Sequence, residues 1–316
     1  MNPRPIAAID IGSNSVYLTL AQFDGDRILY IDRVKDPARL AARIDDEGNL
    51  EEGAIDRVVE TLRRFSSVAA EHDAEIRATA TAAVRGARNA DHVIERVHAE
   101  TGIRIELISG AAEGRLTYLG ALHGLPEMRS SQTVCIDIGG GSTEVLTGRD
   151  GHALLSTSIG VGSLVATQRF IGPDPVSRAA VRRARRALAR RLQVDDFRRL
   201  GFEHAVATSG SVQRIVRLAR GLAGTPLPNL DVHRKRLGRD DVARVVAALS
   251  RARTQSERLK LPEMDPGRAD TLLGGALILE ALTRALGVAE WTVSMSALRT
   301  GLLVDTALRR RALTPP

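Results

Sequence analysis

Two aspartates are placed to do chemistry, because each follows a short apolar run and precedes a loop of small residues. Asp10 lies in "AAIDIGSNS" and Asp137 lies in "VCIDIGGGST". A carboxylate can bind Mg²⁺ or orient water, and consecutive N–H groups in a glycine-rich turn form an anion-binding nest. The pattern therefore predicts metal-assisted chemistry on phosphate. The candidate phosphate-binding residues of the two loops are Gly12, Ser13, Asn14, Ser15, Gly139, Gly140, Gly141, Ser142 and Thr143.

The two phrases repeat one another, since an offset of 127 residues brings Asp10 onto Asp137. A repeat of this length predicts two similar domains rather than a solenoid, and two related domains create a cleft, which is a preferred place for a ligand. Neither loop is a Walker loop, because no Gly-Lys-Ser/Thr follows, and neither opens a helix as a dinucleotide fingerprint does. A plain structural hairpin could explain one copy, but it explains a repeated copy poorly.

A third small-residue loop, "ATSGS" at 207–211, also follows an apolar run. Its hydroxyl groups could simply cap the helix that follows. The loop could instead bind phosphate or nucleotide at a helix N-terminus. The sequence leaves both interpretations open for Ser209, Gly210 and Ser211.

The periodicity of apolar residues places these loops after strands. Residues 1–125 are predicted as β-β-β-α-β-α-β-α, beginning with strands at 6–11, 16–23 and 27–34. The pattern restarts as strand, loop, strand, turn and strand over 133–162, and mainly helices follow. Residues 224–240, rich in Pro, Gly and charge, are predicted to be a loop. The chain is therefore expected to have an α/β fold.

The composition excludes several classes of protein. The 316 residues are 43% apolar and 26% charged, which fits two globular domains. Aromatic residues make up only 3%, so base stacking is not expected and nucleic acid is not a predicted partner. The single cysteine, Cys135, lies in an apolar run and is expected to be a small buried hydrophobe. The histidines show no metal-ligand spacing, so a zinc site is not expected. No apolar run reaches about 18 residues, so we expect a cytoplasmic protein without a membrane segment.

A strongly basic segment, "SRAAVRRARRALARR", accounts for much of the net charge of +7. Its apolar residues Val181, Ala184 and Leu188 share one side of a predicted helix, which is therefore amphipathic. Charge runs of this kind are often solvated faces with nothing bound. The functional alternative is a track for a polyanion, carried by Arg182, Arg183, Arg186 and Arg190.

Five segments together resemble the exopolyphosphatase / guanosine pentaphosphate phosphohydrolase (Ppx/GppA) family. They are "AIDIGSNSVYLTLA", the stretch 78–122, "CIDIGGGSTEV", "ATSGS" and "GRADTLLGGALILEAL". The resemblance covers residues 6 to about 305. It implies the short two-domain form of the family, with duplicated ribonuclease-H-like domains of the actin, Hsp70 and sugar-kinase superfamily and a cleft between them. Domain I would comprise 1–125 plus 297–316, and domain II would comprise 126–296.

The resemblance also implies a phosphoanhydride hydrolase that uses Mg²⁺. Glu113 in "SGAAEGR" matches the base that activates water, and Arg85 matches an arginine that contacts substrate phosphate. The carboxylates at the metal and water site would be Asp10, Asp137 and Glu144, although alternation along the chain does not place Glu144 on the face of Asp137. The expected activity is removal of the terminal phosphate of inorganic polyphosphate. The alternatives are 5′-hydrolysis of guanosine pentaphosphate and a catalytically weak regulator that binds polyphosphate or nucleotide.

The chain departs from the family pattern in three places, one of which is Ala41 in "DPARLAARID", where the family often has glycine. The "SGAAEGR" segment has Ala112 where the family often has a second acidic residue. The "SMSALRTG" segment has Ser296, Ala297 and Thr300 where the family commonly has two glycines and a glutamate. These changes bear on loop geometry and substrate preference. Because the chain leaves no room for the extra helical domains of long members, we expect that a homodimer would supply any long polymer channel.

Overall fold

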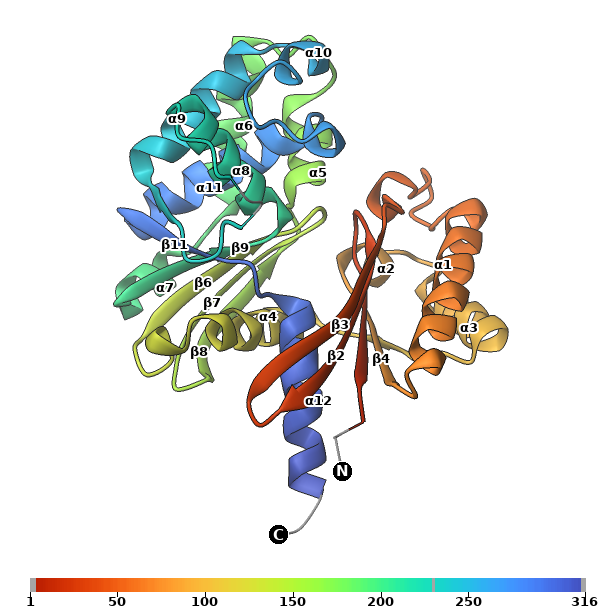
Figure 1. Cartoon of the computed structure of the whole chain (residues 1–316). Coiled ribbons are helices and arrows are strands. Elements are labelled where there is room, and N and C mark those ends of the chain that lie inside the picture. Colours follow the sequence, from red (N-terminus) through yellow and green to blue (C-terminus); the bar gives the residue numbers. More distant parts are fainter. Residues whose placement is uncertain (1–3, 229–230, 314–316) are drawn as a thin grey trace. The chain divides into compact units, whose positions relative to one another are not determined.

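A computed structural model describes residues 4–228 and 231–313 of the chain (Figure 1). The chain divides into two compact units: unit 1 comprises Met1–Gly120 and Leu298–Pro316, and unit 2 comprises Ala121–Ala297. The described residues exclude 1–3 and 314–316 of the predicted domain I and 229–230 of the predicted loop.

Unit 1 is built on a five-stranded mixed sheet. Its strands are β1 (Ile6–Ile11), β2 (Val16–Asp24), β3 (Arg27–Asp36), β4 (Glu75–Ala80) and β5 (Ile105–Leu107). The strand order is β3-β2-β1-β4-β5, with β1, β4 and β5 parallel and β2 antiparallel to both of its neighbours. The carboxyl ends of the three parallel strands therefore share one edge of the sheet.

Helices cover both faces of this sheet. They are α1 (Glu52–Glu71), α2 (Ala82–Arg85), α3 (Ala90–Thr101), α4 (Gly110–Gly124) and α12 (Leu298–Leu313), with a 3₁₀ turn at Leu40–Ala42. Alternate residues of β1 enter different cores: Ile9 packs with residues of α1, α2 and α3, whereas Ala8 packs with Leu116 of α4 and Leu302 of α12. Strands buried on both faces explain the nearly continuous apolar run of "IAAIDI".

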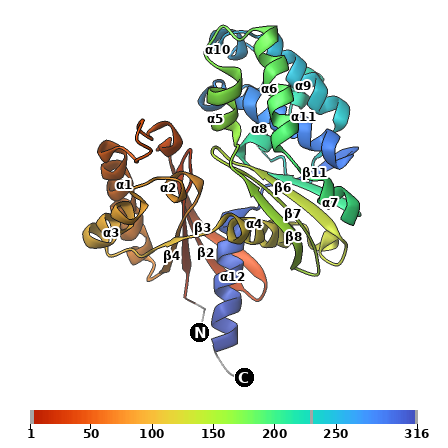
Figure 2. The same ribbon diagram turned by 180° about the vertical axis from the view of Figure 1, so that it is seen from behind.

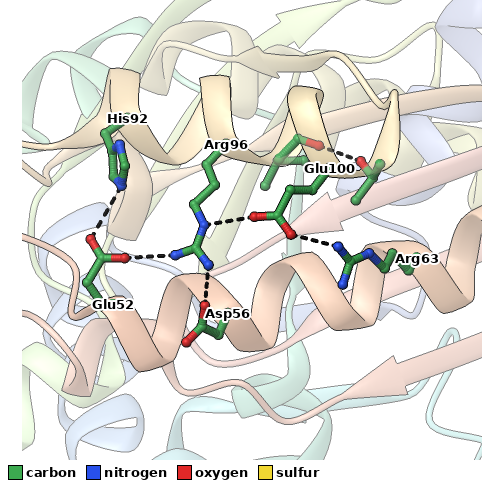
Figure 3. A network of polar contacts seen from close by, with 8 residues as sticks. Glu52, Asp56, Arg63, His92, Arg96 and Glu100 are labelled. Atoms are coloured by element: carbon green, nitrogen blue, oxygen red, sulfur yellow. Dashed lines mark hydrogen bonds and ion pairs between the residues drawn. The ribbon is translucent and has the colours of Figure 1, made fainter.

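An ion network joins α1 to α3 on the surface of unit 1 (Figure 3). Arg96 of α3 pairs with Glu52 and Asp56 of α1 and with Glu100 of its own helix. Arg63 of α1 also reaches Glu100, at 2.6 Å. The carboxylates raise the pKa of Arg96, first through the hydrogen bond to Glu100. The apolar face of α1 packs against the sheet, and the ion network on its other side fixes the position of α3 along α1.

The sheet of unit 2 repeats that of unit 1. Its strands are β6 (Thr133–Ile138), β7 (Thr143–Arg149), β8 (His152–Ile159), β9 (His204–Thr208), β10 (Arg236–Gly238) and β11 (Glu290–Ser294). The order β8-β7-β6-β9-β11 and the strand directions match β3-β2-β1-β4-β5. The predicted α/β class and the predicted duplication are therefore confirmed. β10, which pairs with β11, lies where the sequence predicted only a loop, so that prediction was wrong for Arg236–Gly238.

Helices pack on one side of this second sheet (Figures 1 and 2). They are α5 (Ser163–Ala166), continued by a π-helical turn at Thr167–Ile171, α6 (Arg178–Arg191), α7 (Asp195–Leu200), α8 (Gly210–Leu222), α9 (Arg239–Arg251), α10 (Gln255–Arg258) and α11 (Leu272–Leu286). Short 3₁₀ turns lie at Pro126–Met128 and Pro266–Arg268. The long apolar helix α11 is the centre of this core, where Trp291 Nε1 donates to Thr283 Oγ1 at 2.9 Å.

Among the described residues, no helix is both long enough and apolar enough to cross a membrane.

Candidate functional site

In unit 1, three predicted site elements follow the three parallel strands. The loop Gly12–Ser15 follows β1, α2 with Arg85 follows β4, and α4 with Glu113 follows β5. Because these strands end at the same edge of the sheet, the fold gathers residues that are far apart in the sequence. This edge is the site of unit 1.

Glu113 and Arg85 are in direct contact. Arg85 Nη1 donates to Glu113 Oε2 at 3.0 Å and to the carbonyl oxygen of Ile108 at 2.8 Å. Glu113 lies in the first turn of α4 and is 9% exposed, whereas the Arg85 side chain is 25% exposed. The carbonyl of Ile108 and the carboxylate of Glu113 thus hold the guanidinium in one orientation. The structure brings the predicted base and the predicted phosphate ligand together.

The first loop directs its carbonyl groups toward the protein. Gly12 N–H donates to the carbonyl of Ser15 at 3.1 Å. The carbonyls of Asn14 and Ser13 accept from the N–H groups of Arg39 and Ala41, each at 2.9 Å. Within the part of the chain that the structure describes, the N–H groups of Ser13, Asn14 and Ser15 donate no hydrogen bond. We call these three donors a nest, because consecutive N–H groups in a turn can bind a phosphate oxygen.

Asp10 precedes this loop as a buried carboxylate. Its side chain is 13% exposed, and its Oδ1 atom is buried without a hydrogen-bond partner among the described residues. Burial raises the pKa of Asp10 from 3.8 to about 6, and the positive charge of Arg299 opposes part of this rise. Arg299 Nη1 lies 3.9 Å from Asp10 Oδ2. An ionised carboxylate in this position favours a cation that would take up the unpartnered oxygen.

We predict that Asp10→Asn stabilises the protein at pH 8 in the absence of divalent cations. The raised pKa means that the folded state holds a proton between about pH 4 and pH 6 that the unfolded state has released, so stability falls as the pH rises through this window. The rise from 3.8 to about 6 corresponds to an ionisation cost of roughly 3 kcal/mol above pH 6. Urea unfolding of the parent protein and of Asp10→Asn in EDTA at pH 4, 6 and 8 measures the difference in their free energies of unfolding. The difference should shrink toward pH 4, and a pH-independent difference would contradict the prediction.

In unit 2, Asp137 and Glu144 are directly opposite each other in the antiparallel pair of β6 and β7. Opposite residues of two antiparallel strands project from the same face of the sheet, so these two carboxylates share a face. Ser158 Oγ donates to Glu144 Oε1 at 2.7 Å from the next strand. Thr208, at the end of β9, is in register with Asp137 on the other side. The structure therefore supplies the common face that alternation along the sequence did not indicate.

The second loop repeats the closing hydrogen bond of the first and leaves the equivalent N–H groups available. Gly139 N–H donates to the carbonyl of Ser142 at 3.0 Å. The carbonyls of Gly139 and Gly140 accept from the first N–H groups of α5, those of Ser163 at 2.8 Å and Leu164 at 3.0 Å. Among the described residues, the N–H groups of Gly140, Gly141 and Ser142 donate no hydrogen bond. Unit 2 therefore presents a second nest of three donors beside a carboxylate.

Close packing fixes the second loop against α5. A Cβ atom on Gly162, the residue before α5, would lie 2.4 Å from the carbonyl carbon of Gly140. Only glycine allows this approach without moving the loop backbone. Gly162 therefore determines how the carbonyls of the loop meet the start of α5.

The third loop begins α8. Ser209 Oγ accepts from Val212 N–H at 3.1 Å, so the capping interpretation of Ser209 is confirmed. Ser209 also has φ 122° and ψ 164°, a backbone region that costs a non-glycine residue about 1–3 kcal/mol and that is concentrated at functional sites. A Cβ on Gly210 would lie 3.2 Å from Arg268 Nη2. Arg268, which the sequence analysis did not single out, thus lies beside this loop, and a phosphate role for Ser209, Gly210 and Ser211 stays a prediction.

The three predicted metal ligands belong to different units: Asp10 to unit 1, and Asp137 and Glu144 to unit 2. The described residues contain no group of three or more His, Cys, Asp or Glu side chains that could hold a metal ion. Mg²⁺ usually takes one or two protein carboxylates and completes its shell with water and substrate phosphates. The unpartnered oxygen of Asp10 and the paired carboxylates of unit 2 fit this requirement.

Cys135 is buried in β6, and burial, with the nearby charge of Asp137, raises the pKa of its thiol. A thiol that stays protonated is a poor nucleophile, so Cys135 is the small buried hydrophobe that the sequence predicted.

The basic helix α6 has one buried face and one cationic face. Val181, Ala184 and Leu188 are at most 4% exposed. Arg185 is bound by Glu280 of α11 at 2.7 and 2.9 Å. Arg182, Arg183, Arg186 and Arg190 are exposed, and none of them forms an ion pair with another described residue. In contrast, Arg234 and Arg236 of the basic run 233–236 are paired with Glu127 and Glu290.

Comparison with known proteins gives the same family from sequence and from structure. The model of the Ppx/GppA phosphatase family matches residues 19–310. Exopolyphosphatase 1 of Mycobacterium leprae (strain TN) is 31% identical over 304 residues, which cover 95% of this chain and 88% of that protein. Exopolyphosphatase 1 of Mycobacterium tuberculosis (strain H37Rv) is 30% identical, with 95% and 87% covered.

Solved structures agree with this result. A crystal structure of an exopolyphosphatase from Cytophaga hutchinsonii has a TM-score of 0.86 at 26% identity and covers 96% of this chain and 98% of that chain. A Ppx/GppA family member from Aquifex aeolicus has a TM-score of 0.81 at 26% identity, covering 97% and 98%. This chain therefore belongs to the Ppx/GppA phosphatase family, as the resemblance of its motifs predicted.

Proposed function

We propose that this phosphatase-family protein is a Mg²⁺-dependent exopolyphosphatase that releases orthophosphate from the end of inorganic polyphosphate. The observation that carries the proposal is the repeated nest, in which each unit offers three consecutive N–H donors after a strand that carries an aspartate. A chain of phosphates needs many such donors and has few other features to recognise. Relatives that carry the name exopolyphosphatase over 95% of this chain support the choice of substrate.

In the proposed reaction Arg85 and the nest of unit 1 hold oxygens of the terminal phosphoryl group, and the nest of unit 2 offers donors of the same kind to substrate phosphate. Glu113 accepts a proton from water as the water oxygen bonds to phosphorus, and the bond from phosphorus to the bridging oxygen breaks. The shortened phosphate chain leaves with the electron pair of that bond. Mg²⁺ bound by Asp10 in unit 1, or by Asp137 and Glu144 in unit 2, would neutralise the phosphate charge.

Contact between Arg85 and Glu113 has a consequence for this step. Arg85 Nη1 donates to the carboxylate at 3.0 Å, and in the proposed reaction a phosphate oxygen would take over this donor from Glu113. Substrate binding would thus remove a hydrogen bond that stabilises the ionised carboxylate and would make Glu113 a better proton acceptor.

Phosphate release from three substrates tests the proposal: long-chain polyphosphate, tripolyphosphate and guanosine pentaphosphate, each with Mg²⁺. Processive release from polyphosphate supports it. A preference for guanosine pentaphosphate would assign the protein to the second activity of the family. Tight binding of polyphosphate or nucleotide without turnover would make it a regulator. Light scattering during gel filtration would test the predicted homodimer.

We propose that the exposed arginines of α6 hold the distant part of a long polyphosphate chain. Replacing Arg182, Arg183, Arg186 and Arg190 by glutamine should raise KM for long-chain polyphosphate roughly tenfold at low salt, since exposed ion pairs contribute about 0.2–1 kcal/mol each. KM for tripolyphosphate should not change. The measurement is KM against chain length at two salt concentrations.

A matched control for the α6 variant replaces Arg149, Arg199, Arg244 and Arg251, exposed arginines of the same unit, by glutamine. This variant undergoes the same change in net charge. Equal effects of the two variants would show a general charge effect and would contradict a track on α6.

A further inference from the structure

One arginine at the unit 1 site has no role in the reaction described above. Arg299 lies in the first turn of α12, with its guanidinium carbon 3.9 Å from the centroid of the Tyr17 ring. Tyr17 is directly opposite Asp10 in the pair of β1 and β2. The guanidinium therefore lies over an aromatic face beside the carboxylate that precedes the Gly12–Ser15 loop.

Packing fixes the position of Arg299. Its neighbours Leu298 and Leu302 are 7% and 0% exposed in the core that α12 shares with β1 and α4. A Cβ on Gly301 would lie 1.8 Å from the carbonyl oxygen of Leu116, so α12 touches the backbone of α4 at this turn. A cation–π contact with the Tyr17 ring also holds the guanidinium in place. The Arg299 side chain is thus preorganised, although 35% of it is exposed.

The N–H donors of Arg299 are available. The distance of 3.9 Å from Arg299 Nη1 to Asp10 Oδ2 is too long for a hydrogen bond. The guanidinium donates no hydrogen bond to any other residue in 4–228 or 231–313. Other arginines of unit 1 donate directly to carboxylates: Arg57 reaches Asp36 at 2.9 Å and Arg77 reaches Asp305 at 2.6 Å. An arginine that served only to neutralise Asp10 would be expected to bond to it in the same way.

The charges around the first loop explain what such an arginine would bind. Asp10 lies three residues before Ser13, the first donor of the nest, and its negative charge repels an anion there. Its Oδ1 atom accepts no hydrogen bond from a described residue. A phosphate on the nest therefore needs a cation nearby. A planar guanidinium with free N–H groups matches the oxygens of a phosphate and can bind two of them together.

We propose that Arg299 is a phosphate-binding residue of unit 1 and that Tyr17 is the positioning residue that holds its guanidinium toward the phosphate on the Gly12–Ser15 nest. The inference rests on the proposed function for the identity of the substrate, a phosphate chain. It adds a side-chain cation to the main-chain donors of this loop. It also gives a role to the one arginine in "SMSALRTG", the segment that departs from the family pattern at Ser296, Ala297 and Thr300.

Two measurements test this inference with tripolyphosphate as the probe. Calorimetric binding of tripolyphosphate to the full chain should weaken about tenfold to a hundredfold in Arg299→Gln, the loss expected for a charge-assisted hydrogen bond. In steady-state assays, KM should rise by a similar factor with little change in kcat. Arg299→Lys should recover only part of the affinity, because an ammonium group cannot make the bidentate contact.

Variants of the ring test the positioning role. Tyr17→Phe keeps the aromatic face and should bind tripolyphosphate as the parent protein does, whereas Tyr17→Leu should weaken binding severalfold. The matched control is Arg309→Gln, an exposed arginine of the same helix that pairs with Asp305. It should leave binding unchanged.

The outcomes separate this inference from the proposed function. If the parent protein neither binds nor hydrolyses any of the three phosphate substrates, the proposed function fails. If it does bind tripolyphosphate, and Arg299→Gln keeps the parent affinity and KM while lowering only the melting temperature, Arg299 has a purely structural role and the inference is overturned. Equal losses in Tyr17→Phe and Tyr17→Leu would overturn the role of the ring.

Discussion

Glu113→Gln is expected to lose about 10²–10⁴-fold in kcat for phosphate release while binding polyphosphate nearly as well as the parent protein. Glutamine has the same shape, and its side-chain oxygen can still accept the 3.0 Å hydrogen bond from Arg85 Nη1. It cannot accept a proton from water at neutral pH, so only the chemical step should suffer. Initial rates at saturating polyphosphate, combined with calorimetric binding, separate the two quantities.

The control for this prediction is Glu106→Gln on the adjacent strand β5. The Glu106 side chain is 51% exposed and forms an ion pair with Arg77 at 3.4 Å. This variant should keep the parent rate. Parental activity in Glu113→Gln would remove Glu113 as the base and would leave the reaction without an assigned proton acceptor in unit 1.

Gly301→Ala is expected to have the second large effect, on stability as well as on activity. The added Cβ would lie 1.8 Å from the carbonyl oxygen and 2.6 Å from the carbonyl carbon of Leu116. Both atoms are backbone, so no rotamer change relieves the clash and α12 must move away from α4. We expect a loss of about 3 kcal/mol in the free energy of unfolding, at the upper end for overpacked sites.

Activity should fall together with stability, because α4 carries Glu113 and α12 carries Arg299. Urea unfolding and phosphate release measure the two effects. Gly53→Ala is the matched control: Gly53 lies in helix α1, and its Cβ would have no atom within 4 Å. It should be neutral or slightly stabilising, since alanine favours helix more than glycine does. A Gly301→Ala protein as stable as Gly53→Ala would contradict the close contact between α4 and α12.

The sequence predicted those features that local pattern determines. Apolar runs ending in Asp and a small-residue loop identified β1 and β6, and the repeat of 127 residues predicted the second sheet. β10 was missed because a strand of three residues has no measurable alternation, and it forms only by pairing with β11, which lies more than 50 residues later. Its formation depends on tertiary contact rather than on propensity.

Part of the candidate site required the folded structure. The common face of Asp137 and Glu144 depends on the four-residue turn between β6 and β7, whose hydrogen bonds set the register. Tyr17 and Arg299 meet only because α12 returns to the first sheet from the other end of the chain. Spacing along the sequence carries no signal for such a contact.

The shared hydrogen-bond pattern of the two nests has a consequence for how the loops can evolve. Main-chain N–H groups are present in every amino acid except proline, so the donors do not depend on which side chains the loop carries. The middle of the first loop is Ser13-Asn14 and that of the second is Gly140-Gly141, yet both leave three N–H groups available. If both loops bind phosphate as proposed, their middle residues can therefore differ between the two halves without any loss of the main-chain donors.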